Sequence, residues 1–180
     1  TERLTIPRVV RGGAIAAKAE PADAPAGFVA WAISMSSWLR RVADMGLPTR
    51  YIGFTSVDRR RSGVQKQLSF FHLAGRSTGK GTERLLALWR RHPEWPPLAV
   101  LQHPSVAQPQ EKVDNIDHRV DYLTDEELAD LQNAHMFHLC PSETQGFGHY
   151  IVEAMSTGGV TRTLGAGPKN ELVQRGHGLL

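Results

Sequence analysis

The feature that most constrains this chain is a regular alternation of strand-like and helix-like segments from residue 68 onwards. Apolar runs of strand length lie at 68–75, 97–102, 116–123, 136–141 and 160–164. Helical patterns lie at 81–92, 124–135, 148–159 and 168–176, and the final "HGLL" opens a further element. Strands that alternate with helices on loops of this length pair in parallel. The order therefore predicts the α/β class, with a doubly wound, Rossmann-like parallel sheet.

Local signals support two of the predicted helices. Thr124 has Glu127 three residues after it, which is the spacing of a capping box at a helix start. In the helix predicted at 81–92, an apolar stripe of Leu85, Leu86 and Trp89 is expected to face the core.

The first third of the chain has a different character. Residues 11–27 are rich in Ala, Gly and Pro, so we expect loop or connecting chain there. The apolar segment 28–34 predicts a buried strand, and 50–54 predicts another. Between them, 36–46 predicts a short helix that Gly46 ends.

Charge divides the chain between these two parts. Residues 1–66 hold 11 Lys and Arg against 5 Asp and Glu, whereas residues 67–180 hold 10 against 13. Arg59, Arg60 and Arg61 stand at this boundary, either as a solvated linker or as cations that attract an anionic substrate or membrane surface. The basic residues lack interleaved aromatic side chains, so nucleic acid is not an expected partner.

Cys140 is the only cysteine, so the chain can form no internal disulfide, as is typical of a reducing compartment. We expect it to be a small buried residue at a strand end and not a nucleophile. No apolar run approaches the roughly 18 residues of a membrane-spanning helix, and no signal pattern precedes residue 28. We therefore expect a cytoplasmic protein, with the inner membrane surface as an alternative location. Beginning on Thr1 suggests trimming or a fragment.

A glycine-rich loop, "AGRSTGKGTERLL", joins a predicted strand to a predicted helix at 74–86. Its glycines allow close backbone approach, Arg76 and Lys80 supply cations, and a helix beginning near Gly81 adds free N–H groups. The loop lacks the spacing of a P-loop, because Thr82 follows a glycine and not the lysine. It is either a phosphate-binding turn or a solvated turn with two surface cations.

A second loop, "PSETQGFGHYIVEAM", follows the strand predicted at 136–141. Gly146 and Gly148 permit a tight turn into a helix, and Glu153 falls in the second turn of that helix. A carboxylate accepts hydrogen bonds from sugar or ribose hydroxyls. The alternative is a surface glutamate beside an apolar stripe of Ile151, Val152 and Met155. Cations in one loop and hydroxyl acceptors in the other suggest a nucleotide sugar.

These two motifs, with a later "NELV", resemble those of the C-terminal, donor-binding domain of GT-B fold glycosyltransferases of family 4, the glycosyl transferases group 1 domain. The resemblance covers residues from about 66 to 180, and residues 28–58 are similar to the end of the partner N-terminal domain. It implies a remnant of the acceptor-side domain at 1–58, a basic linker at 59–67 and a C-terminally truncated donor-binding domain at 68–180. An incomplete GT-B fold is therefore expected.

The resemblance also implies an activity, which is transfer of a hexose from a UDP-, GDP- or ADP-sugar to a hydroxyl acceptor, with retention. Arg76 and Lys80 would hold the donor diphosphate and stabilise leaving-group charge, and Glu153 would bind the ribose. The positions it assigns to donor binding are Gly75, Arg76, Lys80, Gly146, Phe147, Gly148 and Glu153. It implies no cofactor and no metal ion, and His135 and His138, which straddle a helix end and a strand, are not expected to form a metal site.

Gln145 departs from the family pattern, and a larger departure is length, since a complete two-domain enzyme would be roughly twice this size. The first glutamate of the paired-glutamate motif stands eight positions before the second, and counting back from Glu153 reaches Gln145. We assign Gln145 to the catalytic set with Arg76 and Lys80. Glutamine lacks the negative charge, so it should weaken catalysis more than binding. Glu143 is an alternative substitute. Arg162 also departs, since it stands where an apolar strand residue is usual.

Two hypotheses from different classes remain open. The chain is the donor-binding part of a glycosyltransferase, whose isolated form turns over poorly, or it is a degenerate, non-catalytic nucleotide-binding or interaction module of the same fold. A sugar phosphorylase or a nucleotide-sugar epimerase lacks a specific motif here. The expected partners are a nucleotide-sugar donor and a carbohydrate or lipid-linked acceptor, and peripheral membrane association is an open alternative.

Overall fold

The computed structural model describes residues 56–143, 148–165, 169–174 and 178–179, and within the first 55 residues only 17–19, 30–33, 43–44, 46 and 49–51. Contacts divide the chain into two compact units, Thr1–Thr55 with Gln145–Gly148, and Ser56–Thr144 with His149–Leu180. The three-part division expected from the sequence, with its linker at 59–67, stays a prediction.

The described part of the first unit holds a small three-stranded sheet. Strand β2 (Ala30–Ile33) pairs in parallel with β3 (Thr49–Tyr51) and antiparallel with β1 (Ala17–Ala19). β2 lies inside the strand predicted at 28–34 and β3 overlaps the one predicted at 50–54. The loop expected over 11–27 was wrong at β1, because alanines carry little strand preference of their own and the pairing with β2 creates the strand. Most of the helix predicted at 36–46 lies outside the described residues.

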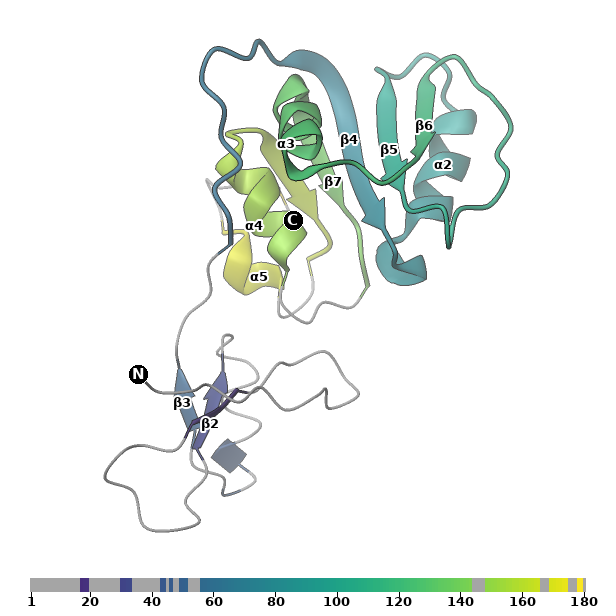
Figure 1. Cartoon of the computed structure of the whole chain (residues 1–180). Coiled ribbons are helices and arrows are strands. Elements are labelled where there is room, and N and C mark those ends of the chain that lie inside the picture. The colour runs from purple at the N-terminus through teal and green to yellow at the C-terminus, as the bar shows by residue number, and fades with distance from the viewer. Residues whose placement is uncertain are drawn as a thin grey trace. The chain divides into compact units, whose positions relative to one another are not determined.

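The second unit is built on a six-stranded sheet in which every pair of neighbours is parallel. Its strands lie in the order β6-β5-β4-β7-β8-β9. From β4 the chain winds outwards in one direction through β5 and β6, and from β7 it winds outwards in the other (Figure 1). The bounds are β4 (Gln67–Gly75), β5 (Leu98–Gln102), β6 (Ile116–Val120), β7 (His135–Cys140), β8 (Val160–Thr163) and β9 (Gly178–Leu179). The predicted doubly wound parallel sheet is confirmed.

Four helices of this unit lie where the periodicity predicts them: α2 (Thr82–Arg90), α3 (Asp125–Ala134), α4 (His149–Ser156) and α5 (Lys169–Leu172). A short 3-10 helix that was not predicted, η1 (Thr78–Lys80), precedes α2. The capping box before α3 is confirmed, since the Thr124 hydroxyl accepts from the Glu127 amide and the Glu127 carboxylate accepts from the Thr124 amide. Among the described residues, no helix has the length and apolar character needed to cross a bilayer.

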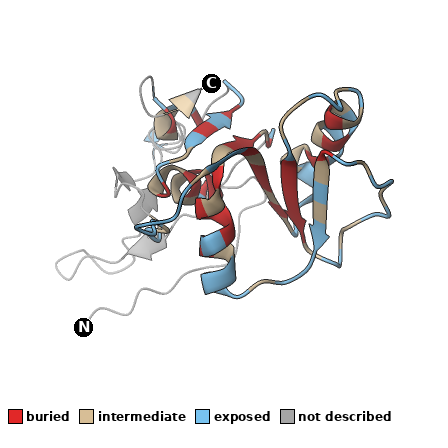
Figure 2. Cartoon of the chain, turned by 90° about the horizontal axis from the view of Figure 1, so that it is seen from above, coloured by how far each residue is buried: buried red, intermediate tan, exposed pale blue. Residues whose placement is uncertain are grey.

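Helices cover the sheet from both sides, with α2 on one face and α3 and α4 on the other (Figure 1). All five residues of β5 are buried, and they divide between the two faces. Val100 packs in the cluster beneath α2, whereas Ala99 and Leu101 pack with Leu131 of α3. Buried residues follow the central strands in Figure 2. A strand buried on both faces needs a continuous apolar run, which is the pattern the sequence showed.

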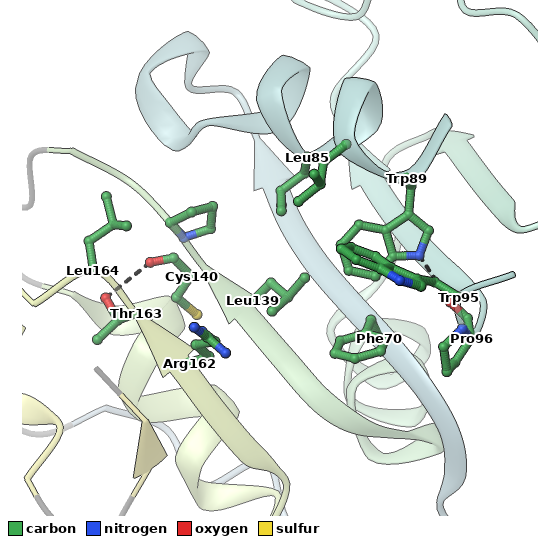
Figure 3. Close-up of a pocket in the computed structure, with 12 residues that line it drawn as sticks. Phe70, Leu85, Trp89, Trp95, Pro96, Leu139, Cys140, Arg162, Thr163 and Leu164 are labelled. Atoms are coloured by element: carbon green, nitrogen blue, oxygen red, sulfur yellow. Dashed lines mark hydrogen bonds between the residues drawn. The ribbon is translucent and has the colours of Figure 1, made fainter. Parts of the chain in front are cut away.

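Helix α2 covers only part of its face, and an apolar pocket of about 490 Å³ lies beside it (Figure 3). Trp89 and Trp95 line one end, and Arg162 and Leu164 line the other. In β8 the residues alternate: Thr161 and Thr163 are buried, whereas Val160 and Arg162 are exposed, and Arg162 lines the pocket. Arg162 therefore replaces an apolar strand residue at a place where its charge reaches solvent.

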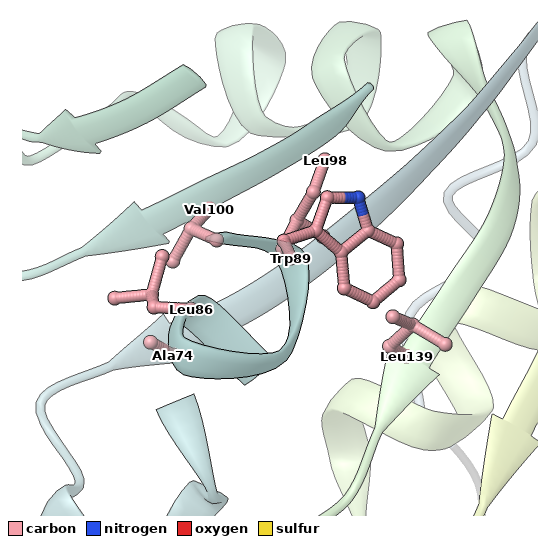
Figure 4. Close-up of a cluster of buried hydrophobic side chains, with 6 residues drawn as sticks. All are labelled: Ala74, Leu86, Trp89, Leu98, Val100 and Leu139. Atoms are coloured by element: carbon pink, nitrogen blue, oxygen red, sulfur yellow. The ribbon is translucent and has the colours of Figure 1, made fainter. Parts of the chain in front are cut away.

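The core beneath α2 is dominated by Leu86 and Trp89 (Figure 4). Both are buried, as their positions on the apolar stripe predict, and Leu85 packs against the cluster at its margin. Phe70 of β4 meets the Trp89 ring edge-on, with ring centres 5.1 Å apart. The same cluster holds Ala74 and Leu98, so α2 is fixed directly over β4 and β5.

Candidate functional site

The winding of the sheet marks one place at its carboxyl edge. Strands β4 and β7 are neighbours, yet the chain leaves them towards opposite sides. In open α/β sheets, the crevice at such a switch point is where ligands bind. The loop after β4 and the loop after β7 flank this point, and they are the two loops that the sequence predicts to bind a ligand.

The loop after β4 turns sharply at two glycines. Gly75 has φ +58° and Gly81 has φ +73°, both in the left-handed region that favours glycine. Between them the Ser77 hydroxyl accepts from the Gly79 amide at 3.3 Å, which starts η1. The amide of His103, at the end of β5, donates to the Gly75 carbonyl at 3.0 Å and ties the turn to the sheet edge.

The two loops lie against each other at Gly81. A Cβ atom at this position would stand 3.3 Å from both the Cγ and the carbonyl oxygen of Pro141. Arg84 of α2 also pairs with Glu143, with Nη1 2.5 Å from Oε1. This pair does not test Glu143 as the substitute for the glutamate that the resembled family has at position 145, but it engages the Glu143 carboxylate with α2.

Lys80 links the first loop to α4. Its Nζ donates to the Leu73 carbonyl at 3.0 Å and lies 4.2 Å from the centre of the Tyr150 ring. Burial lowers the pKa of Lys80 from its ordinary 10.5, and the negative charge of Glu153 acts in the opposite direction. Lys80 thus contacts α4 through the Tyr150 ring, and Glu153 belongs to the same helix.

Arg76 is exposed and makes no hydrogen bond or ion pair with other described residues. Thr82, in contrast, is buried, and its hydroxyl lies 3.0 Å from Nε2 of His72. A hydroxyl held in the core cannot act as the phosphate-side threonine of a P-loop, so the superficial likeness ends there. The two cations of this loop are the exposed Arg76 and the half-buried Lys80, whose Nζ is bonded to the Leu73 carbonyl.

The loop after β7 is anchored from below by a buried lysine. The Nζ of Lys169, at the start of α5, donates to the Ser142 carbonyl, and the Tyr150 hydroxyl donates to the Ser142 hydroxyl at 2.8 Å. Lys169 is fully buried, and that burial lowers its pKa. Sequence analysis missed this role. The one signal was a lysine two residues before the glutamate of "NELV", and nothing local showed that it points inwards.

Glu153 is not the surface residue of the alternative interpretation, because its side chain is only 13% exposed. Its Oε1 accepts from the Ser56 hydroxyl at 3.3 Å, and its Oε2 lies 3.8 Å from Nε of Arg59. His149 begins α4, and its Nδ1 lies 3.1 Å from the same Ser56 hydroxyl. Arg59 is 12% exposed and is thus neither a solvated linker residue nor a free surface cation.

Three residues of the proposed site, Gln145, Gly146 and Phe147, lie outside the described residues. Gly148 directly precedes α4 and has φ +81°, so the tight turn into the helix does require glycine at that position. Within the second unit, the first loop contacts Pro141 through Gly81 and α4 through Lys80. The roles of Gln145 and Gly148 in a site stay predictions.

The apolar pocket beside α2 is separate from these residues. Neither Arg76 nor Lys80 lines it, and neither Gly148 nor Glu153 does. Cys140 does line it, but its thiol is buried and its pKa is raised to about 12 by that burial. The expectation of a small buried cysteine at a strand end is confirmed.

Two histidines of β7, His135 and His138, belong to the core. His135 lies 2.7 Å from the Ser69 hydroxyl through Nδ1 and stacks on Phe71, and His138 lies 3.3 Å from the Thr157 hydroxyl. Across the described ranges, no group of three His, Cys, Asp or Glu side chains is arranged to hold a metal ion. This leaves the question of a metal at the ligand edge to experiment.

Comparison with known proteins gives no match to a family model or to a curated protein sequence. Solved structures do match. Sucrose-phosphate synthase from Thermosynechococcus elongatus superposes with a TM-score of 0.59 and 20% identity over 81% of this chain and 43% of its own. The pneumococcal O-GlcNAc transferase GtfA, solved with UDP and GlcNAc, superposes with a TM-score of 0.58 and 13% sequence identity, over 79% of this chain and 31% of its own. WaaG, a glycosyltransferase involved in lipopolysaccharide biosynthesis, superposes with a TM-score of 0.50 and 16% sequence identity, over 73% of this chain and 43% of its own.

These likenesses establish the fold. The chain has the α/β fold of GT-B glycosyltransferases, as the motif resemblance predicts, and it spans less than half the length of each structure it matches. At these identities the matches carry no activity over to this chain.

Proposed function

We propose that this chain carries the donor site of a nucleotide-sugar-dependent glycosyltransferase. The observation that supports it best is the meeting of the two predicted loops at the switch point, where Gly81 abuts Pro141 and Lys80 lies 4.2 Å from the centre of the Tyr150 ring of α4. A cation on the first loop and the Glu153 carboxylate on α4 suit a ligand with a phosphate end and a hydroxyl-bearing end.

In this proposal each group has a defined task. Arg76 and Lys80 bind the donor diphosphate and stabilise the charge that develops as it leaves, without a metal ion. Glu153 accepts hydrogen bonds from the ribose hydroxyls. Gln145 faces the donor sugar. Backbone at Gly75, Gly146, Phe147 and Gly148 approaches the phosphates and the sugar.

The reaction proposed is transfer of a hexose, with retention, to a hydroxyl on a carbohydrate or lipid-linked acceptor. Two of the structures that the fold resembles, GtfA and WaaG, are glycosyltransferases, which favours this class. The proposed setting is the cytoplasm, with the membrane surface as the site of a lipid-linked acceptor.

Calorimetric titration of the folded chain with UDP, GDP and ADP tests the donor site. At least one should bind, and Lys80→Met should weaken it about 10- to 150-fold, the range for loss of one charged hydrogen bond. Lys112→Met is the matched control, because Lys112 is an exposed lysine between β5 and β6 and should leave binding unchanged. Silence from all three nucleotides on a folded sample would refute the proposal.

A second function, a nucleotide-binding module without catalysis, is favoured by one observation. Position 145 holds a neutral amide where the resembled family has a glutamate. Gln145→Glu tests it through release of nucleoside diphosphate from UDP-, GDP- and ADP-sugars. A large gain in turnover with unchanged donor affinity supports the non-catalytic module, and no gain supports Gln145 as a working residue.

A further inference from the structure

The segment that enters the second unit, residues 56–61, is fastened to helices α3 and α4. The Arg59 amide donates to the Ser156 hydroxyl at 2.8 Å, and the Asn133 side chain donates to the Arg59 carbonyl at 2.6 Å. The Arg61 amide donates to the same Asn133 side chain at 3.1 Å. The backbone at residues 59 and 61 is therefore held against α3 and α4.

The Arg59 guanidinium lies between the two helices. Its Nη2 is 3.1 Å from Oδ1 of Asp125, and its Nη1 donates to the Asp125 carbonyl at 3.3 Å. These two contacts orient the planar group, and its Nε then faces Oε2 of Glu153 at 3.8 Å. The Nε atom is buried and has no hydrogen-bond partner among the described residues. Glu153 is the acid that this buried donor faces.

Ser56 acts on the other oxygen of the same carboxylate. Its hydroxyl donates to Oε1 of Glu153 at 3.3 Å and lies 3.1 Å from Nδ1 of His149. A hydroxyl of the protein thus occupies a place on Glu153 that suits a ribose hydroxyl, since both donate to a carboxylate oxygen.

We propose that Arg59 is a positioning residue that holds the Glu153 carboxylate in the orientation that distinguishes ribose from deoxyribose. This inference rests on the proposed function, in which Glu153 binds the ribose. Arg59 fixes Oε2 by charge, so Oε1 is presented to the ligand, whose hydroxyl replaces that of Ser56. Without Arg59 the side chain regains several rotamers, and the hydrogen bond to the ribose loses its geometry.

The test is calorimetric titration of the whole chain with the nucleoside diphosphate that binds most tightly among UDP, GDP and ADP, and with its 2′-deoxy counterpart. The parent should prefer the ribonucleotide roughly tenfold, as expected for one hydrogen bond to a carboxylate. Glu153→Gln should reduce that preference. Arg59→Met should reduce it to the same degree while leaving the affinity for the deoxynucleotide within about twofold, because the phosphate contacts remain.

Arg61→Met is the matched control. Arg61 belongs to the same segment, is 40% exposed and pairs with Asp130 of α3, not with Glu153. It should keep the full ribose preference. Arg59→Lys provides a second variant if the methionine variant fails to fold. It keeps a positive charge but cannot contact Asp125 and Glu153 together, so its preference should lie between those of the parent and Glu153→Gln.

The outcomes separate the two claims. If the parent binds no nucleotide, the proposed function fails and this inference fails with it. If the parent prefers ribose and folded Arg59→Met or Arg59→Lys keeps the full preference, the inference alone is overturned. A variant that weakens both nucleotides equally acts through the fold, and that result also overturns it.

Discussion

Buried histidines should make this protein unstable in mild acid. Burial lowers the pKa of His72 to about 4 and that of His138 to about 4, whereas an unfolded histidine titrates near 6.5. Between those values the unfolded chain binds protons that the folded chain does not. Stability is therefore fully present above pH 6.5 and falls as the pH drops towards 4.

The size of the effect follows from the two pKa values. At pH 5 each histidine should lower the free energy of unfolding by about 2 kcal/mol. Near pH 4 and below, the loss reaches about 3 kcal/mol for each histidine. Two such groups remove about 4 kcal/mol at pH 5, a large part of the 5–15 kcal/mol typical of a domain. The pKa of His135 is also lowered by burial, and it acts in the same direction.

Urea unfolding followed by tryptophan fluorescence, at pH values from 7.5 to 5, measures this loss. His72→Gln keeps a side chain that can hydrogen bond to the Thr82 hydroxyl but removes the titrating group. Carboxylates contribute equally in parent and variant, so the difference between the two pH profiles isolates His72. The variant should lose about 2 kcal/mol less than the parent between pH 7.5 and 5. Parallel profiles would show that His72 is not the buried, neutral group described above.

Three further predictions concern the loops and α4. Gly81→Ala forces a positive φ and contact with Pro141, so it should lower the free energy of unfolding by about 1–2 kcal/mol in urea titration; an unchanged midpoint would contradict the close approach of the loops. In Gly159→Ala the new Cβ would lie 2.6 Å from the His138 ring, so a cost of about 1–3 kcal/mol is expected, and a neutral effect would contradict this packing. Ser56→Ala frees the carboxylate oxygen that the ribose uses and should tighten ribonucleotide binding a few-fold in calorimetry, whereas weaker binding would show that Ser56 supports the site.

The sheet could be predicted because each strand and helix carries a signal in its own local sequence. Strand β5 is an apolar run buried on both faces, and α3 carries its own capping box at Thr124. These signals depend on residues within a few positions of one another. They place the strands and helices of the second unit within a few residues of the observed bounds, and the parallel order follows from their alternation.

What the sequence could not show depends on distant partners. Arg59 looks like one of three linker arginines, and its place beside Glu153 arises from two residues 94 positions apart in the chain. Lys169 looks like an exposed helix-start lysine, yet it is buried beneath Ser142. No periodicity or spacing encodes such contacts. The position of Gln145, on which catalysis was predicted to depend, lies outside the described residues.

The central claim is that the loops after β4 and β7 form one site for a nucleoside diphosphate. Amide chemical shifts recorded during titration with UDP, GDP or ADP test it most directly. If these loops form the site, saturable shifts are expected at Gly75–Gly81 and at Gly148–Glu153, with little change around Trp95 in the apolar pocket. Saturable shifts centred on that pocket, or none in either loop, would contradict it.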